Sequence, residues 1–335
     1  MARFAALVAL SLALVAVPRS ARADFSDNPY PCMFCLFEIR VAHGEGWILP
    51  NEHMSTFLGL SPDREQVLFW EYRDVAGTRP FIGRETIYGK RTRSIVDVDS
   101  TFMSEQRADW SPDGRRIAFP LSRDAPAPCR GRALWVANVD RTNAHRVAGP
   151  CTTGHPVWSP DSRRVAFFDD GALSTVGADG SDLRRLDAST TRSGTPGWSP
   201  DGRWIAYDVG PEARPTIRIV PSDGVAAARD VAHGNLPMWS PDGRRLVFTS
   251  RGGAVFVVDQ SGRNLRRIAR LGYLPTWSPD GRTIAYVSDQ IFLVRPDGMG
   301  RRQLTHLKPG GMVDWFAWTR NSKRLLYGWE FTDVD

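Results

Sequence analysis

Residues that usually carry catalysis or bind metals are scarce in this sequence. Its 335 residues include four cysteines and six histidines, and its lysines are Lys90, Lys308 and Lys323. The sequence lacks the His-Glu-x-x-His and phosphate-loop motifs. The nearest match to Gly-x-Ser-x-Gly surrounds Ser199, but Asp201 stands where that hydrolase motif needs glycine. The sequence therefore gives no direct sign of an enzyme.

Long apolar runs are also rare. The run 4–17 is shorter than the roughly 20 residues that span a bilayer. Arg3 precedes this run, and Ala21-Arg22-Ala23 follows it as a small-x-small cleavage site. We expect residues 1–23 to be a signal peptide, with an uncleaved anchor as the alternative. No other run is long enough to span a bilayer, so we expect no integral membrane segment in the mature chain.

The charge does not favour a nucleic-acid partner. The net charge of +6 falls to +3 when Arg3, Arg19 and Arg22 leave with the signal peptide. The remaining basic residues are spread along the chain beside acidic ones, rather than gathered in one stretch.

The four cysteines suit an exported protein, in which an even count favours disulfides. We favour the pairs Cys129–Cys151 and Cys32–Cys35 among the possible pairings. Cys129 and Cys151 flank two neighbouring expected strands and so lie at the same end of them. Cys32 and Cys35 form a Cys-x-x-Cys motif, for which a structural clip is favoured over redox or metal-binding roles.

What the sequence does contain is a repeat. Each copy reads Trp, Ser or Thr, a turn, one or two basic residues and an apolar triplet, as in WSPDGRRIAF. Six copies begin at Trp110, Trp158, Trp198, Trp239, Trp277 and Trp318, and a worn copy begins at Leu60. Successive copies begin 38 to 50 residues apart. A repeat of this length built from short β-like runs predicts an all-β fold, the β-propeller, with one blade per copy.

One repeat shows how a blade forms. From Thr195 the expected strands are 195–198, 203–209, 216–220 and 227–232, joined by Pro-Asp-Gly and Ser-Asp-Gly turns. No segment has a convincing helical period, so we expect almost no helix. We expect each repeated Trp to pack in the core, with the Arg after the turn lying on its ring. The repeated Asp residues are expected to form turns.

The ends of the chain are expected to meet in one blade. The last copy leaves room for two strands, and 36–42 and 46–51 supply the two that are missing. This gives seven blades over residues 36–335, preceded by a segment 24–35 that carries the Cys-x-x-Cys. Six blades remain the alternative if the worn first unit forms none.

The repeat, with endings such as RRQLTHL (301–307), LRRLD (183–187) and LRRIA (265–269), resembles the propeller repeat of the TolB family. The resemblance covers nearly the whole mature chain and implies a periplasmic scaffold that binds proteins. TolB itself carries an extra α/β domain before its propeller, whereas about a dozen residues separate Asp24 from the first expected strand here. Similar repeats also accompany the hydrolase domain of prolyl-oligopeptidase-type peptidases, for which this sequence has no counterpart.

We expect binding on the face that carries the irregular loops. The longest are 73–86 and 122–132, and Phe81, Ile82 and Arg84 are the expected exposed anchors. Residues just before each inner strand should rim the central channel. These are Arg107, Asp109, His155, Thr195, Leu236, Leu274 and Trp315.

The sequence thus predicts an exported, monomeric propeller without enzymatic activity, periplasmic or secreted, that binds a protein or peptide of the cell envelope. We assign Phe81, Ile82, Arg84, Arg107, His155 and Trp315 to binding. The alternative is a metal-dependent hydrolase or lyase in the channel. Its metal would be held by His155, His233 and His306 with Asp169 or Asp170, or would be calcium bound by carboxylates and carbonyls.

Overall fold

The structure is a computed structural model of the chain. It describes residues 34–40, 46–48, 56–72, 80–86, 93–98, 108–121, 132–149, 151–188, 194–307 and 311–331. The expected signal peptide, Cys32, Arg107, Cys129 and most of the two long loops lie outside the described residues.

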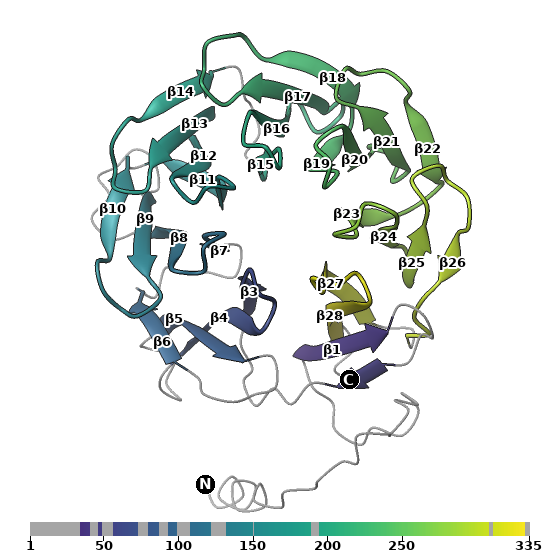
Figure 1. The fold of residues 1–335 in the computed structure, drawn as a ribbon, viewed down its shortest axis with the longest axis horizontal. Coiled ribbons are helices and arrows are strands. Elements are labelled where there is room, and N and C mark those ends of the chain that lie inside the picture. Colours follow the sequence, from purple (N-terminus) through teal and green to yellow (C-terminus); the bar gives the residue numbers. More distant parts are fainter. Residues whose placement is uncertain are drawn as a thin grey trace, which may run out of the picture.

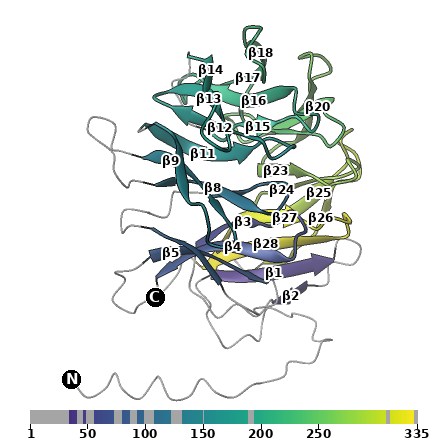
Figure 2. The same cartoon turned by 60° about the vertical axis from the view of Figure 1, so that its left-hand side comes forward.

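The described strands form seven antiparallel sheets of four strands each, arranged as a ring around a central axis (Figure 1). Figure 2 shows the ring tilted, with each sheet lying beside the next. Six sheets are made of consecutive strands. They are β3 (Thr56–Leu60), β4 (Gln66–Tyr72), β5 (Pro80–Thr86) and β6 (Arg93–Asp97); β7 (Asp109–Trp110), β8 (Arg116–Leu121), β9 (Ala133–Asn138) and β10 (His145–Ala148); β11 (Thr152–Trp158), β12 (Arg164–Asp169), β13 (Ala172–Gly177) and β14 (Arg184–Asp187); β15 (Gly197–Trp198), β16 (Trp204–Val209), β17 (Thr216–Pro221) and β18 (Arg229–His233); β19 (Asn235–Trp239), β20 (Arg245–Thr249), β21 (Val255–Asp259) and β22 (Arg266–Ala269); β23 (Tyr273–Trp277), β24 (Ile284–Val287), β25 (Ile291–Val294) and β26 (Arg302–Gln303).

The all-β prediction is confirmed, and the seven sheets agree with the seven-bladed prediction rather than the six-bladed one. Within the described residues no helix occurs, and so none is long and apolar enough to cross a membrane. We number the sheets as blades 1 to 6 in chain order and count the strands of a blade outward from the channel.

Blade 7 joins the two ends of the chain, as predicted. Its strand order is β2-β1-β28-β27, with β1 (Phe34–Arg40) and β2 (Gly46–Ile48) outside β28 (Arg324–Phe331) and β27 (Gly311–Trp318). The β1–β28 pairing runs without a break from Phe34 opposite Glu330 to Arg40 opposite Arg324. The first strand begins two residues earlier than expected, so Cys35 lies on β1. This pairing removes the sheet edges that an unclosed ring would leave.

The repeated Ser-x-Asp forms the turn between the first two strands of each blade. In blade 4, Ser199 Oγ donates to Asp201 Oδ1 at 2.6 Å and accepts from the Trp204 amide at 2.9 Å. The Arg203 amide donates to the same Asp201 oxygen at 3.1 Å. Gly202 has a φ of +72° there, which glycine adopts without steric cost. The same bonds recur in the other copies, so the aspartates are turn formers as predicted.

Four of the repeated tryptophans donate a hydrogen bond from Nε1 to a backbone carbonyl of the preceding blade. Trp158 Nε1 donates to the Asp109 carbonyl oxygen at 3.1 Å, and Trp239 Nε1 donates to that of Gly197 at 2.9 Å. Trp198 and Trp277 make the same bond, so the carbonyl before one tryptophan accepts from the next. The repeat therefore fastens neighbouring blades as well as filling the core.

The predicted arginine–tryptophan stacking occurs between blades rather than within one repeat. The Arg116 guanidinium lies 4.9 Å from the ring centre of Trp158, and Arg245 lies 5.0 Å from that of Trp277. Both arginines open the second strand of one blade and cover the tryptophan of the next. The apolar core lies likewise between facing sheets: Ala118 and Val136 of blade 2 pack with Phe167 of blade 3.

Candidate binding face and channel

Different connections between strands lie on the two faces of the ring. The turn face carries the turns that join first to second and third to fourth strands, such as 199–203 and 222–228. The loop face carries the second-to-third loops, such as 250–254, and the connectors between blades. First strands run from the loop face to the turn face, so a residue three positions before the repeated Trp lies near the loop face.

The inner strands of blades 5 and 7 present apolar side chains to solvent. Leu236 and Met238 on β19 and Met312 on β27 are exposed. Leu274 on β23 is half-buried. Exposure alternates along this part of β19, where buried Pro237 lies between exposed Leu236 and Met238. Sequence reasoning named the two leucines but missed the methionines, which this alternation could have indicated.

Backbone distortions fix these leucines in place. Leu236 has a φ of +53° and Leu274 a φ of +51°, a conformation uncommon for a bulky side chain. The pairing registers of β19 and β23 shift at the same points, between Asn235 and Met238 in β19. Bulges of this kind redirect side chains. The buried carboxylate of Asp208 helps to hold this conformation, because its Oδ1 accepts the Leu236 amide at 3.3 Å.

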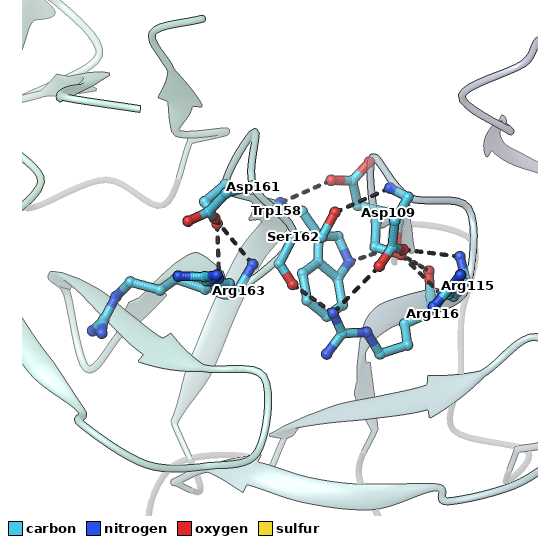
Figure 3. A network of polar contacts seen from close by, with 11 residues as sticks. Asp109, Arg115, Arg116, Trp158, Asp161, Ser162 and Arg163 are labelled. Carbon is cyan, nitrogen blue, oxygen red and sulfur yellow. Dashed lines mark hydrogen bonds and ion pairs between the residues drawn. The ribbon is translucent and has the colours of Figure 1, made fainter. Parts of the chain in front are cut away.

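Asp109 places a carboxyl group on the inner wall of the channel, at the position directly before the repeated Trp. The described residues at this level are Gly59, Asp109, Val157, Gly197, Met238, Thr276 and Ala317. Burial raises the pKa of Asp109 to about 7, against the opposing effects of the Trp158 amide and of Arg64. Asp109 Oδ2 accepts the Trp158 amide at 3.0 Å, as Figure 3 shows. The carboxyl group therefore changes protonation near neutral pH while it joins blades 2 and 3.

The expected exposed anchors are not exposed. Phe81 and Ile82 lie on β5, the third strand of blade 1, and are 7% and 0% exposed. Arg84 on the same strand donates to Gln66 Oε1 at 2.8 Å. The prediction of a loop over 73–86 is therefore wrong from residue 80 onward. The segment pairs with β4 along its whole length, although its sequence PFIGRET lacks the alternation of apolar residues that predicts a strand.

The other predicted rim residues lie on or beside inner strands. His155 is on β11 and Thr195 lies two residues before β15, and both are partly exposed. Trp315 on β27 is partly buried against a cluster that includes Val67 and Phe81 of blade 1. It therefore contributes to the junction of blades 7 and 1 as well as to the rim.

The histidines of the metal hypothesis come from different depths of the ring. His155 is on an inner strand, whereas His233 ends β18, the outermost strand of blade 4, with Nδ1 3.3 Å from Thr216 Oγ1. His306 follows β26, the outermost strand of blade 6. Among the described residues no three histidine, cysteine or carboxylate side chains are grouped to hold a metal ion. These residues do not fit a metal centre.

Cys151 is disulfide-bonded. Its backbone lies beside that of Arg132, whose carbonyl oxygen accepts the Thr152 amide at 2.9 Å. Cys129 is outside the described residues, and so is the side chain of Cys35. The pairings Cys129–Cys151 and Cys32–Cys35 therefore stay predictions.

Known proteins show where this architecture recurs. Residues 170–327 match the family model described as the TolB beta propeller domain. No curated protein matches the chain.

Solved structures share the fold over most of the chain. A structure assigned to TolB from Agrobacterium tumefaciens is 17% identical, with a TM-score of 0.52, over 90% of this chain and 99% of its own. An oligogalacturonate lyase in complex with manganese is 15% identical, with a TM-score of 0.55, over 85% of this chain and 80% of its own. Hydrazine synthase of Kuenenia stuttgartiensis is 13% identical, with a TM-score of 0.51, over 75% of this chain and 80% of its own. Because TolB-type propellers and enzymes share it, the fold does not decide the function.

Proposed function

We propose that this protein is a binding module without enzymatic activity, which captures a protein or peptide at the loop-face mouth of the channel. We further propose that residues 1–23 direct its export and that it acts as a monomer in the periplasm or outside the cell. The observation that carries the proposal is the group formed by Leu236, Met238 and Met312, three exposed apolar side chains on inner strands.

The physical case rests on the cost of that arrangement. Apolar side chains in water gain free energy when a partner covers them, at roughly 25 cal/mol per Å². Leu236 is also held in an unfavourable backbone conformation, which buried Asp208 helps to maintain. Strained positions of this kind are found mainly at functional sites. A partner that inserts apolar side chains into the mouth of the channel, beside the inner strands of blades 5 and 7, would cover this surface.

The enzymatic alternative lacks such support. A channel hydrolase or lyase of the kind considered from the sequence needs a bound metal, and the described histidines and carboxylates do not come together to hold one. The similarity to a manganese-containing lyase is a similarity of fold at 15% identity. We therefore assign no reaction to the channel.

Affinity capture from cell-envelope extracts tests the proposal. The double variant Leu236→Gln, Met238→Gln should lose the partner that the wild-type protein retains. Leu271→Gln is the matched control, since Leu271 is an equally apolar, exposed residue on the connector that follows β22. Thermal melting establishes that all three proteins are folded. Equal capture by the double variant and the wild type would contradict the proposed site.

A further inference from the structure

The turn face carries a second set of exposed apolar side chains, far from the channel. They lie in the turns between third and fourth strands of four consecutive blades, the teal to yellow part of the ring in Figure 1. These residues are Leu183, Val225, Leu265 and Met299. Val225 is 86% exposed, the most of any large apolar residue described. A large apolar side chain is not required to form this turn, because the corresponding turn of blade 2 has exposed Ala144.

The turns hold these side chains outward in a fixed geometry. Asp223 Oδ1 accepts the Val225 amide at 3.0 Å, and Asp297 Oδ1 accepts the Met299 amide at 2.9 Å. Leu183 and Leu265 each follow a residue with positive φ, Asp182 and Asn264 respectively. The exposed positions are thus built by ordered turns at the ends of the sheets.

Arginines surround these four positions. The segments 178–185, 222–229, 260–267 and 295–302, which we call the basic arc, contain nine arginines and four aspartates. The basic arc therefore carries a net charge of +5, although the chain without its expected signal peptide carries only +3. Arg184 pairs with Asp182 at 2.7 Å and Arg295 with Asp297 at 3.3 Å, which leaves the arginines in excess.

We infer that the basic arc docks on the surface of an anionic lipid bilayer. Basic residues near an anionic membrane surface gain about 1 kcal/mol each, and apolar side chains that enter the interface add to this. A soluble polyanion would engage the arginines but leave the four apolar side chains in water. The combination on one face fits the charged headgroups and the acyl boundary of a bilayer at once.

This inference goes beyond the proposed function, because it uses the opposite face. A propeller that rests on its basic arc directs the loop face away from the bilayer. Leu236 and Met238 then remain available to a partner while the protein is bound to the membrane.

Vesicle co-sedimentation of the full mature chain tests the inference. We expect binding to phosphatidylcholine vesicles that contain about one third phosphatidylglycerol, and much weaker binding to phosphatidylcholine alone. Arg263→Gln with Arg295→Gln, both exposed at the turns, should weaken binding about 30-fold, the effect of two arginines at about 1 kcal/mol each. Val225→Gln with Met299→Gln should weaken it about tenfold, through the lost apolar burial.

The matched control is Arg270→Gln with Leu271→Gln, which removes the same kinds of side chain from a connector on the loop face. It should bind vesicles as the wild type does. Three results would overturn the inference: no binding to anionic vesicles, equal loss in the control, or binding of dextran sulfate or DNA that depends on the same arginines without binding to vesicles. None of these depends on capture at Leu236 and Met238, so the two proposals fail separately.

Discussion

Replacing tryptophan by phenylalanine in two adjacent blades should separate the fastening role of the repeat from its packing role. Trp158 and Trp110 occupy the same repeat position and are 3% and 5% exposed. Trp158 Nε1 donates to the Asp109 carbonyl oxygen, whereas the buried Nε1 of Trp110 has no hydrogen-bond partner in the described part of the chain. Arg116 covers the Trp158 ring. The position that would cover Trp110 holds Gln66, because the first repeat is worn.

The difference between the two substitutions can be estimated from these contacts. Both remove a similar apolar area, so that cost largely cancels. Trp158→Phe also leaves a buried carbonyl without its donor, which costs about 1–3 kcal/mol. It weakens the stacking with Arg116 by about 0.5–1 kcal/mol. Trp110→Phe removes a buried donor that has no partner. Trp158→Phe should therefore lower the free energy of unfolding by about 2–3 kcal/mol more than Trp110→Phe.

Guanidinium chloride unfolding, followed by circular dichroism, measures this difference. The denaturant dependence should be the same for both variants, so that the midpoints report stability alone. Trp318→Phe is a further control, because buried Trp318 Nε1 also lacks a described partner and Thr283 stands in place of the covering arginine. Equal destabilisation by Trp158→Phe and Trp110→Phe would refute the view that hydrogen bonding between blades stabilises the ring.

Three further predictions follow from groups in the fold. Burial raises the pKa of Asp109 to about 7, whereas its pKa in the unfolded chain is about 4. The contribution of Asp109 to stability is therefore present below about pH 4 and is lost as the pH rises toward 7. Asp109→Asn should abolish this part of the pH dependence of the free energy of unfolding. The Ser199 hydroxyl lowers the pKa of Asp201, so Ser199→Ala should raise that pKa in an NMR titration and remove stability that the wild type has above about pH 4 and loses on acidification. Removal of β1 and β2 should lower the melting temperature by about 10 °C or more and cause aggregation, because β28 would become an open edge; an unchanged, monomeric protein would contradict this.

The repeat made most of the fold predictable, because the sequence of nearly every blade contains its own turn, inner tryptophan and apolar triplet. The closure of blade 7 was predictable by counting strands. Segment 80–86 could not be predicted as a strand, because PFIGRET lacks an alternation of apolar residues and lies in blade 1, whose repeat is worn. The stacking of Arg116 on the next blade's tryptophan depends on how blades pack, which the repeat itself does not encode.

The candidate site was less predictable for a related reason. The proposed binding at the rim would use positions where the repeats differ, such as Leu236 and Met312, and a single sequence gives no rule for which differences matter. The left-handed conformation of Leu236 recurs at Leu274, where Thr249 stands in the place of Asp208. It therefore accompanies the bulge of the inner strand, and Asp208 adds a hydrogen bond at Leu236. The repeat motif does not show which inner strands carry this bulge.

The pairing of β1 with β28 also sets an order of events during synthesis. A ribosome delivers β1 among the first segments and β28 among the last, so β1 waits for its partner until nearly the whole chain has been made. Blades 1 to 6 are local and can assemble meanwhile, whereas the pairing of β1 with β28 closes a loop of nearly the whole chain at a larger entropic cost. We expect this pairing to complete the fold, after β28 has been made.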